Sequence, residues 1–163
     1  METPFYKYAQ LNSENAGVEH LWDGLYDMIN EANLIINSKD VSSSYKAEAE
    51  FFRAYSYDML VTLWGPVPLI TESTSTPRTD YTRMSVIDVD KVIETDLTDA
   101  MENLPAVGKT VTEDRVNKDC ARMLAAQAYL RMGMRDASYF KKAEDAITPT
   151  ITEGNYKLID ARY

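Results

Sequence analysis

The sequence predicts an all-α protein in which about five main helices stack as antiparallel hairpins. Apolar residues recur every three or four positions through most of the chain, which is the spacing of one buried stripe on a helix. Residues that cap or stop helices separate these stretches, and no convincing pair of strands lies between them. A chain of 163 residues is long enough to bury one core, so we expect 1–163 to form a single domain.

The first predicted helix spans about residues 13–38. Asn12 or Ser13 is its expected N-cap, because a short polar side chain can accept a hydrogen bond from the first-turn amides. Its apolar stripe consists of Val18, Leu21, Trp22, Leu25, Met28, Ile29, Ala32, Ile35 and Ile36.

The second predicted helix runs from about residue 43 to residue 64. Gly65 can adopt a left-handed cap conformation, and Pro66 and Pro68 prevent the helix from continuing. The polar stretch 71–84 then reads as a loop whose length is typical of functional or covering loops.

Capping residues also mark the next two helices. Ser85 and Asp88 form a capping box for a third helix that ends at Pro105. Asn117 caps a fourth, alanine-rich helix that ends at Gly133, and small side chains there let a neighbouring helix approach closely.

The fifth predicted helix begins near Ala137 and is broken at Pro149. A turn at 153–155 and an extended stretch at 156–159 follow it. The fourth and fifth helices are similar to a tetratricopeptide hairpin, although no clean sequence repeat is present. The small and aromatic positions of that motif correspond to Tyr129, Gly133, Ala143 and Ala146.

Composition argues against several classes of function. The net charge of −9 disfavours nucleic-acid binding, which needs clustered Lys and Arg to neutralise phosphates. Cys120 is the single cysteine and His20 the single histidine, so neither a disulfide nor a Cys- or His-rich metal site is expected. No apolar run is long enough to span a membrane. We predict no metal and no cofactor.

Catalysis is also not expected. Glu94, Asp96 and Asp99 lie on one predicted helix, and we interpret them as part of a solvated face, because paired catalytic carboxylates need a shared cleft and unequal surroundings. His20 is read as a packed or surface histidine. The sequence contains no phosphate-binding glycine loop, metal-ligand spacing or nucleophile elbow, so we predict no catalytic residue.

Arg53 lies among aromatic residues on the second helix. Its neighbours one turn away are Glu50 and Tyr57. A desolvated guanidinium needs hydrogen-bond partners, either a carboxylate or the carbonyls where a neighbouring helix ends. We interpret Arg53 as a structural clamp; a ligand anchor is the alternative.

Tyrosine is the most abundant aromatic residue, with eleven Tyr against four Phe. A tyrosine inside a helix usually packs in the core, whereas one in a loop is better placed to stack on a ligand. The expected ligand contacts are loop residues of two kinds, tyrosines for stacking and Asn or Arg side chains for hydroxyl recognition. They are Tyr6, Tyr8, Asn12, Arg78, Tyr81 and Arg83.

The stretch AEAEFFRAYSYDMLVTLWGPVPLI, residues 47–70, resembles the SusD/RagB family of nutrient-binding outer-membrane lipoproteins of Bacteroidetes. Four further blocks agree in order, beginning with the Trp-x3-Tyr-x2-Ile-x3-Asn helix and ending with Gly-x-Tyr-x-Leu. Pro66 departs from the family, which often has Asp or Gly there. The residues that carry the family's structural signature, called the signature residues below, are Trp22, Tyr26, Asn33, Glu50, Arg53, Gly65 and Pro68.

This resemblance implies a helical, tetratricopeptide-like scaffold that captures a glycan or peptide at the cell surface and delivers it to a SusC-like TonB-dependent transporter. It implies that the chain corresponds to the helical N-terminal portion of longer proteins, whose lipidated N-terminal cysteine anchors them to the outer membrane and whose C-terminal region is rich in loops. Residues 1–163 are then a fragment that lacks both. The alternative is a tetratricopeptide-like scaffold that binds only protein.

Overall fold

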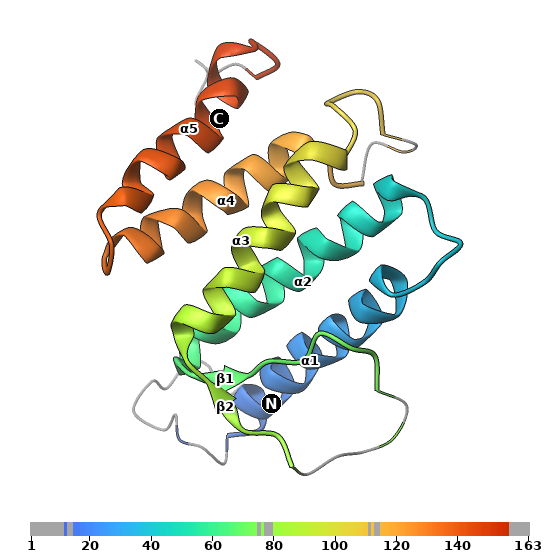
Figure 1. Ribbon diagram of the computed structural model, residues 1–163, viewed down its shortest axis with the longest axis vertical. Helices are drawn as coiled ribbons and strands as arrows, with labels where there is room; N and C mark the ends of the chain where they lie inside the picture. The colour runs from blue at the N-terminus through green and yellow to red at the C-terminus, as the bar shows by residue number, and fades with distance from the viewer. Residues whose placement is uncertain are drawn as a thin grey trace, which may run out of the picture.

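The computed structural model describes residues 12, 15–74, 76, 80–110, 112 and 115–156. Five helices in this part of the chain lie in a row in sequence order, each antiparallel to the one before it (Figure 1). They are α1 (Ala16–Ile36), α2 (Ser43–Trp64), α3 (Val86–Asn103), α4 (Lys118–Gly133) and α5 (Ser138–Thr152). The all-α prediction is confirmed.

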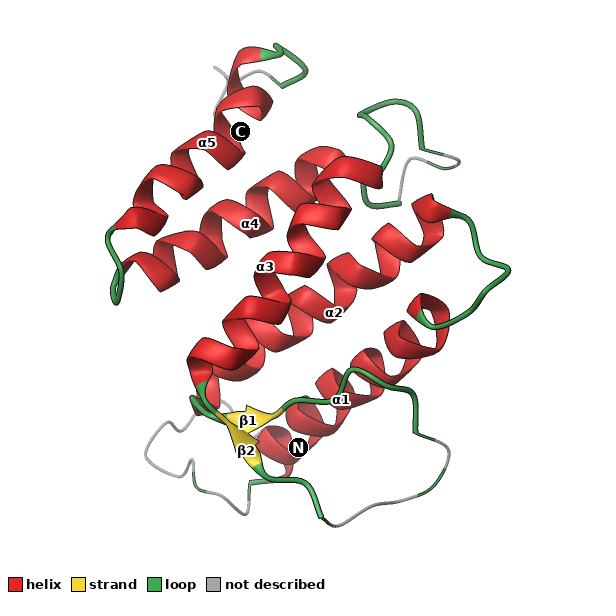
Figure 2. Cartoon of the chain, viewed as in Figure 1, coloured by secondary structure: helices red, strands yellow, loops and turns green. Residues whose placement is uncertain are grey.

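One short strand pair was not expected. Strands β1 (Val67–Pro68) and β2 (Arg83–Met84) pair antiparallel at the end of α2, with Val67 opposite Met84 and Pro68 opposite Arg83 (Figure 2). The prediction that no strands pair is therefore wrong at this place. Two residues per strand are too few for an alternating pattern to show in the sequence.

The starts of the helices depend on side-chain caps. The cap of α1 is Asn15, rather than the predicted Asn12 or Ser13: the Asn15 side-chain oxygen accepts a hydrogen bond from the amide of Gly17 at 2.9 Å. Asn12 lies outside the helix and Ser13 lies outside the described residues. For α3 the predicted capping is confirmed, since the Ser85 hydroxyl accepts from the amide of Asp88 at 3.2 Å.

The Asn117 side-chain oxygen caps α4 by accepting hydrogen bonds from the next helical amides, those of Asp119 and Cys120. The predicted cap of α4 is confirmed. At the end of α2, Gly65 has a φ of 71° and a ψ of −127°. The predicted helix end is therefore confirmed, but the predicted left-handed cap conformation is wrong, because it needs a positive ψ as well as a positive φ.

Helix α5 continues through Pro149, contrary to the predicted break. The ring removes one backbone donor, but the helix ends only three residues later at Thr152, so few hydrogen bonds depend on it. The carbonyl of Pro149 still accepts from the amide of Glu153 at 2.9 Å.

A continuous core joins the helices, with Ile29, Tyr57, Leu60, Val89, Ile93, Leu97, Ala125, Ala128 and Met132 among its fully or almost fully buried members. Helix α5 packs closely on α4 because Gly133 faces Phe140. A Cβ atom at Gly133 would lie 2.5 Å from the Phe140 ring, so only glycine fits there without a shift. The predicted close approach of the last two helices thus depends on this residue.

Candidate functional site

The segment after β1 runs back across α1 (Figure 1). It carries the start of the polar loop in which ligand contacts are expected. The signature residues Tyr26, Asn33 and Arg53 lie beneath it, and with their partners they form a polar network that we call the clamp. The clamp consists of Tyr26, Asn33, Arg53, Tyr57 and Asp96.

Arg53 is the centre of the clamp. Its guanidinium donates two hydrogen bonds to the carboxylate of Asp96 on α3, at 2.8 and 2.7 Å, and a third to the side-chain oxygen of Asn33 on α1, at 2.7 Å. Three helices are therefore joined by one side chain. Burial disfavours the charge on Arg53, but its hydrogen bonds to Asp96 and the negative charge of that carboxylate outweigh burial, so the pKa of Arg53 is raised.

Asp96 corrects the prediction of a solvated acidic face. It is 2% exposed because it faces Arg53 across the α2–α3 interface. Single-helix periodicity cannot show this, since a buried carboxylate needs a cation from another helix. Glu94, by contrast, is partly exposed and pairs with Lys142 of α5 at 2.5 Å.

Asn33 and Tyr57 connect the clamp to the backbone of the segment after β1. The Asn33 amide donates to the carbonyls of Ile70 and Glu72 at 3.0 and 3.3 Å. The Tyr57 hydroxyl donates to the carbonyl of Ile70 at 2.9 Å and accepts from its amide at 2.7 Å. Burial raises the pKa of Tyr57 to about 12, so the hydroxyl keeps the proton that it donates.

The other end of the segment is held by aromatic residues. The Tyr26 hydroxyl donates to the carbonyl of Pro68 at 2.8 Å. Trp22 packs edge-on against Trp64, with ring centres 5.2 Å apart, and lies 5.0 Å from the ring of Tyr26. Two more asparagines of α1 also contact the segment: Asn30 accepts from the amide of Thr74, and Asn37 donates to the carbonyl of Thr71.

The predicted ligand residues are only partly within the described chain. Tyr81 is half-buried and lines a hollow of about 220 Å³ together with Tyr26, Asn30, Ile70 and Thr74. We call this the Tyr81 hollow. Its walls combine an aromatic ring, an amide and a hydroxyl, which are groups that suit a polar ligand with an apolar face.

Arg83 lies in β2, exposed and opposite Pro68, so the strand pair brings it to the same end of the fold as the Tyr81 hollow. Burial, followed by the neighbouring Tyr57, raises the pKa of Tyr26, and the positive charge of Arg83 opposes this rise. Asn12 is exposed just before α1, and its carbonyl accepts from the amide of Asn15 at 3.2 Å. The other predicted contacts, Tyr6, Tyr8 and Arg78, lie outside the described residues.

A second buried ionic cluster was missed in the sequence. Arg131 of α4 donates to Asp58 of α2 at 2.9 Å and to Asp90 of α3 at 2.8 Å, and Arg135 also pairs with Asp90. The two aspartates are 2% and 5% exposed. The available signal was Asp58 itself, an acidic residue inside an apolar helix stretch, which needs a partner cation.

Glu50 gives a testable pH dependence. It lies one turn before Arg53, and burial, followed by the charges of Asp99 and Asp96, raises its pKa from 4.5 to about 7. Because the folded-state pKa is raised, this carboxyl stabilises the fold below pH 4.5, and the stabilisation is lost as the pH rises through 7. We expect Glu50→Gln to raise the free energy of unfolding at pH 8 by about 1 kcal/mol, a value reduced for solvent screening. Urea unfolding at several pH values measures this difference, with Glu102→Gln as the exposed control. If the free energy of unfolding of both variants changes with pH as it does in the unmodified protein, the prediction is wrong.

Other kinds of site find no support among the described residues. In that part of the chain no three His, Cys, Asp or Glu side chains are grouped so that they could hold a metal ion. None of the helices described there is long and apolar enough to cross a membrane.

The SusD-like family model described as "starch-binding associating with outer membrane" matches residues 4–130. The SusD-like protein P38 of Formosa agariphila is 28% identical over 147 residues, which are 86% of this chain and 28% of P38. The chain thus spans under a third of the length of this relative.

Solved structures agree in fold. A SusD homologue from Bacteroides thetaiotaomicron superposes with a TM-score of 0.81 at 23% identity, over 91% of this chain and 32% of the homologue. A laminarin-binding SusD-like protein gives a TM-score of 0.71 at 26% identity, over 86% of this chain and 32% of that protein. Because the family model matches most of the residues and the helices superpose on those of its members, the chain belongs to the SusD-like family.

Proposed function

We propose that this protein binds carbohydrate at the cell surface and delivers it to a SusC-like TonB-dependent transporter in the outer membrane. The observation that carries the proposal is the family match over residues 4–130. The laminarin-binding relative supports a glycan as ligand; a peptide is the other ligand class that the family resemblance implies. A lipid anchor at the N-terminus of the whole protein would hold it at the outer membrane.

The clamp and the Tyr81 hollow supply a physical basis for binding. Ligand contacts on a loop need a fixed backbone, because ordering a mobile loop on binding costs free energy. Here five side chains hold the backbone of residues 68–74. The Tyr81 ring at the edge of this held segment is in a position to stack on a sugar face.

Affinity electrophoresis through gels containing soluble starch, laminarin or xylan tests this proposal, with casein peptides as a competitor. We expect retardation in at least one polysaccharide, and a roughly tenfold weaker interaction for Tyr81→Ala, because a stacking ring is lost. Tyr55→Ala is the matched control, since Tyr55 is an exposed tyrosine on α2, away from the hollow. Equal retardation of both variants would exclude Tyr81 as a contact, and no retardation in any gel would contradict carbohydrate binding.

A second candidate function is a scaffold that binds only protein. Met123 and Leu130 of α4 are 61% and 54% exposed, and Met134, which follows the last residue of the helix, is 82% exposed. Their spacing places them on one side of the helix. Apolar surface of this kind often contacts a partner. Retention of a SusC-like transporter by the immobilised protein, without any saccharide affinity, would favour this reading.

A further inference from the structure

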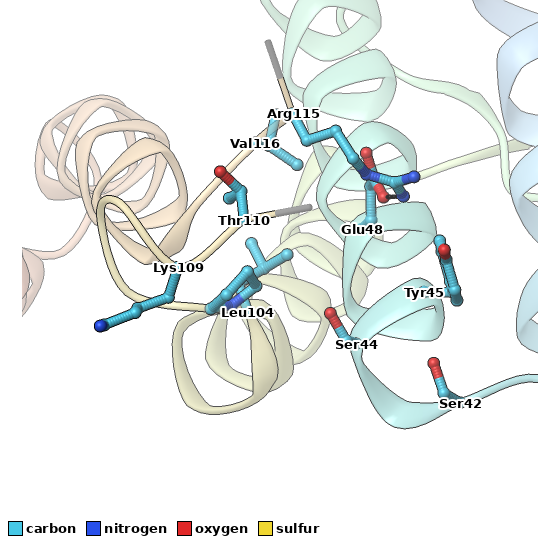
Figure 3. A pocket seen from close by; sticks show the side chains of 10 residues that line it. Ser42, Ser44, Tyr45, Glu48, Leu104, Lys109, Thr110, Arg115 and Val116 are labelled. Atoms are coloured by element: carbon cyan, nitrogen blue, oxygen red, sulfur yellow. Dashed lines mark hydrogen bonds and ion pairs between the residues drawn. The ribbon is translucent and has the colours of Figure 1, made fainter. Parts of the chain in front are cut away.

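A second pocket, of about 230 Å³, lies at the end of α2 that is remote from the strand pair (Figure 3). Its walls come from the first turns of α2, the end of α3 and the loop that leads to α4. The Tyr81 hollow is lined by residues of α1 and of the loop after β1, so the two sites share no lining residue. No residue proposed so far to contact ligand lines it.

One wall of the pocket is an aromatic ring with a fixed ion pair beside it. The guanidinium carbon of Arg115 lies 4.6 Å from the ring centre of Tyr45. The same guanidinium pairs with the carboxylate of Glu48, one turn along α2. Although it is held on one side in this way, Tyr45 remains 46% exposed.

The floor of the pocket is packed on buried residues. Leu104 lines it and belongs to a small buried cluster that also contains Ala47, Ala100 and Ala121. Next to Leu104, the carbonyl of Pro105 accepts a hydrogen bond from the amide of Lys118 at 2.8 Å. The floor is therefore held by core packing and by a backbone hydrogen bond.

Hydroxyl groups complete the lining. Ser42, Ser44 and Thr110 all contribute to the walls, and the structure gives their hydroxyls no hydrogen bond to any of the residues it describes. Ser42 precedes α2 but makes no side-chain cap bond. These hydroxyls can therefore donate to or accept from a ligand without breaking an existing bond.

We propose that this pocket binds one sugar unit of a neutral saccharide, as a second contact point apart from the Tyr81 hollow. The Tyr45 ring packs on the apolar face of the sugar, and Arg115 and Glu48 donate to and accept from neighbouring hydroxyls. The proposal deepens the proposed function and rests on it, because it assigns the same ligand class to a further site.

Charge and size both favour this ligand. Glu48 already neutralises Arg115, and the side chain of Lys109, the other cation of the lining, extends away from them (Figure 3). The two cations therefore do not converge, as they would in an anion site. Its 230 Å³ lies below the roughly 300–1,000 Å³ of pockets for drug-sized ligands, which suits a single ring. A longer saccharide would leave the pocket through its open side.

Titration of the ¹⁵N-labelled protein with D-glucose and with maltohexaose, followed by NMR, tests the proposal. We expect the amides of Glu48, Thr110 and Val116 to shift, with about tenfold weaker binding for Tyr45→Ala and near-unchanged binding for Tyr45→Phe, which keeps the ring. Tyr55→Ala, an exposed tyrosine on the same helix outside the pocket, should bind as the unmodified protein does.

The possible results separate the two proposals. If only amide signals of residues around the Tyr81 hollow change in chemical shift, the proposal of a second contact point is wrong and the proposed function still stands. Shifts at neither place, together with no retardation in polysaccharide gels, would contradict both. Pocket shifts that persist in Tyr45→Ala would also overturn the assignment, because they would show that the ring does not bind the sugar.

Discussion

Arg53→Ala is expected to lower the free energy of unfolding by about 3–5 kcal/mol, because it leaves the carboxylate of Asp96 buried without its cation. The same change removes the donor that holds Asn33. Urea denaturation followed by circular dichroism measures the loss. A domain with stability of the usual 5–15 kcal/mol would then be partly unfolded at moderate temperature.

Two controls distinguish this clamp from a ligand contact. Arg83→Ala removes an exposed arginine and should change stability by no more than about 0.5 kcal/mol. The double variant Arg53→Met/Asp96→Leu should recover much of the lost stability, because replacing both charges removes the unpaired one. A stable Arg53→Ala protein that has lost only saccharide affinity would show that Arg53 is a ligand anchor instead.

Arg131→Ala is expected to be equally damaging. It leaves two nearly buried carboxylates, Asp58 and Asp90, of which only Asp90 keeps a cation, from Arg135. We expect a loss of about 3–5 kcal/mol, measured by thermal or urea unfolding.

Arg135→Ala is the matched control for this cluster. The Arg135 side chain is 42% exposed, and Asp90 would retain Arg131, so the expected loss is only about 1 kcal/mol. A cluster in which Arg131→Ala and Arg135→Ala cost the same would contradict the central role of Arg131.

Much of the helical architecture follows from local signals in the sequence. Apolar spacing and the caps at Ser85 and Asn117 depend on neighbouring residues only, so they can be read from one segment. The start of α1 was displaced because three polar residues near it could each cap, and the structure uses Asn15. The predicted break at Pro149 was wrong because the free-energy cost of a proline in a helix depends on how close the helix end is.

The candidate site depends on distant residues and was therefore less predictable. The need of Arg53 for hydrogen-bond partners was clear, but its partner Asp96 is 43 positions away and looked like part of a surface. The Tyr81 hollow and the Tyr45 pocket each combine elements that no local pattern joins. The length and polarity of the loop 71–84 pointed to this region, but not to the residues of α1 and α2 that hold its backbone.

The hydrogen bonds to residues 68–74 almost all reach a backbone atom of that segment. The exception is a long bond of 3.5 Å from the Thr74 hydroxyl to the side-chain oxygen of Asn30. Asn30 and Asn33 of α1, and Asn37 directly after it, are spaced so that they lie on one face of the helix. Each of them forms a hydrogen bond with a different peptide group of the segment. The backbone path of the segment is consequently determined by side chains of α1 and α2, and depends little on the side chains of the segment itself. Glu72 and Ser73 could therefore be exchanged for other residues without moving the chain, which leaves the protein free to acquire new specificities on an unchanged frame.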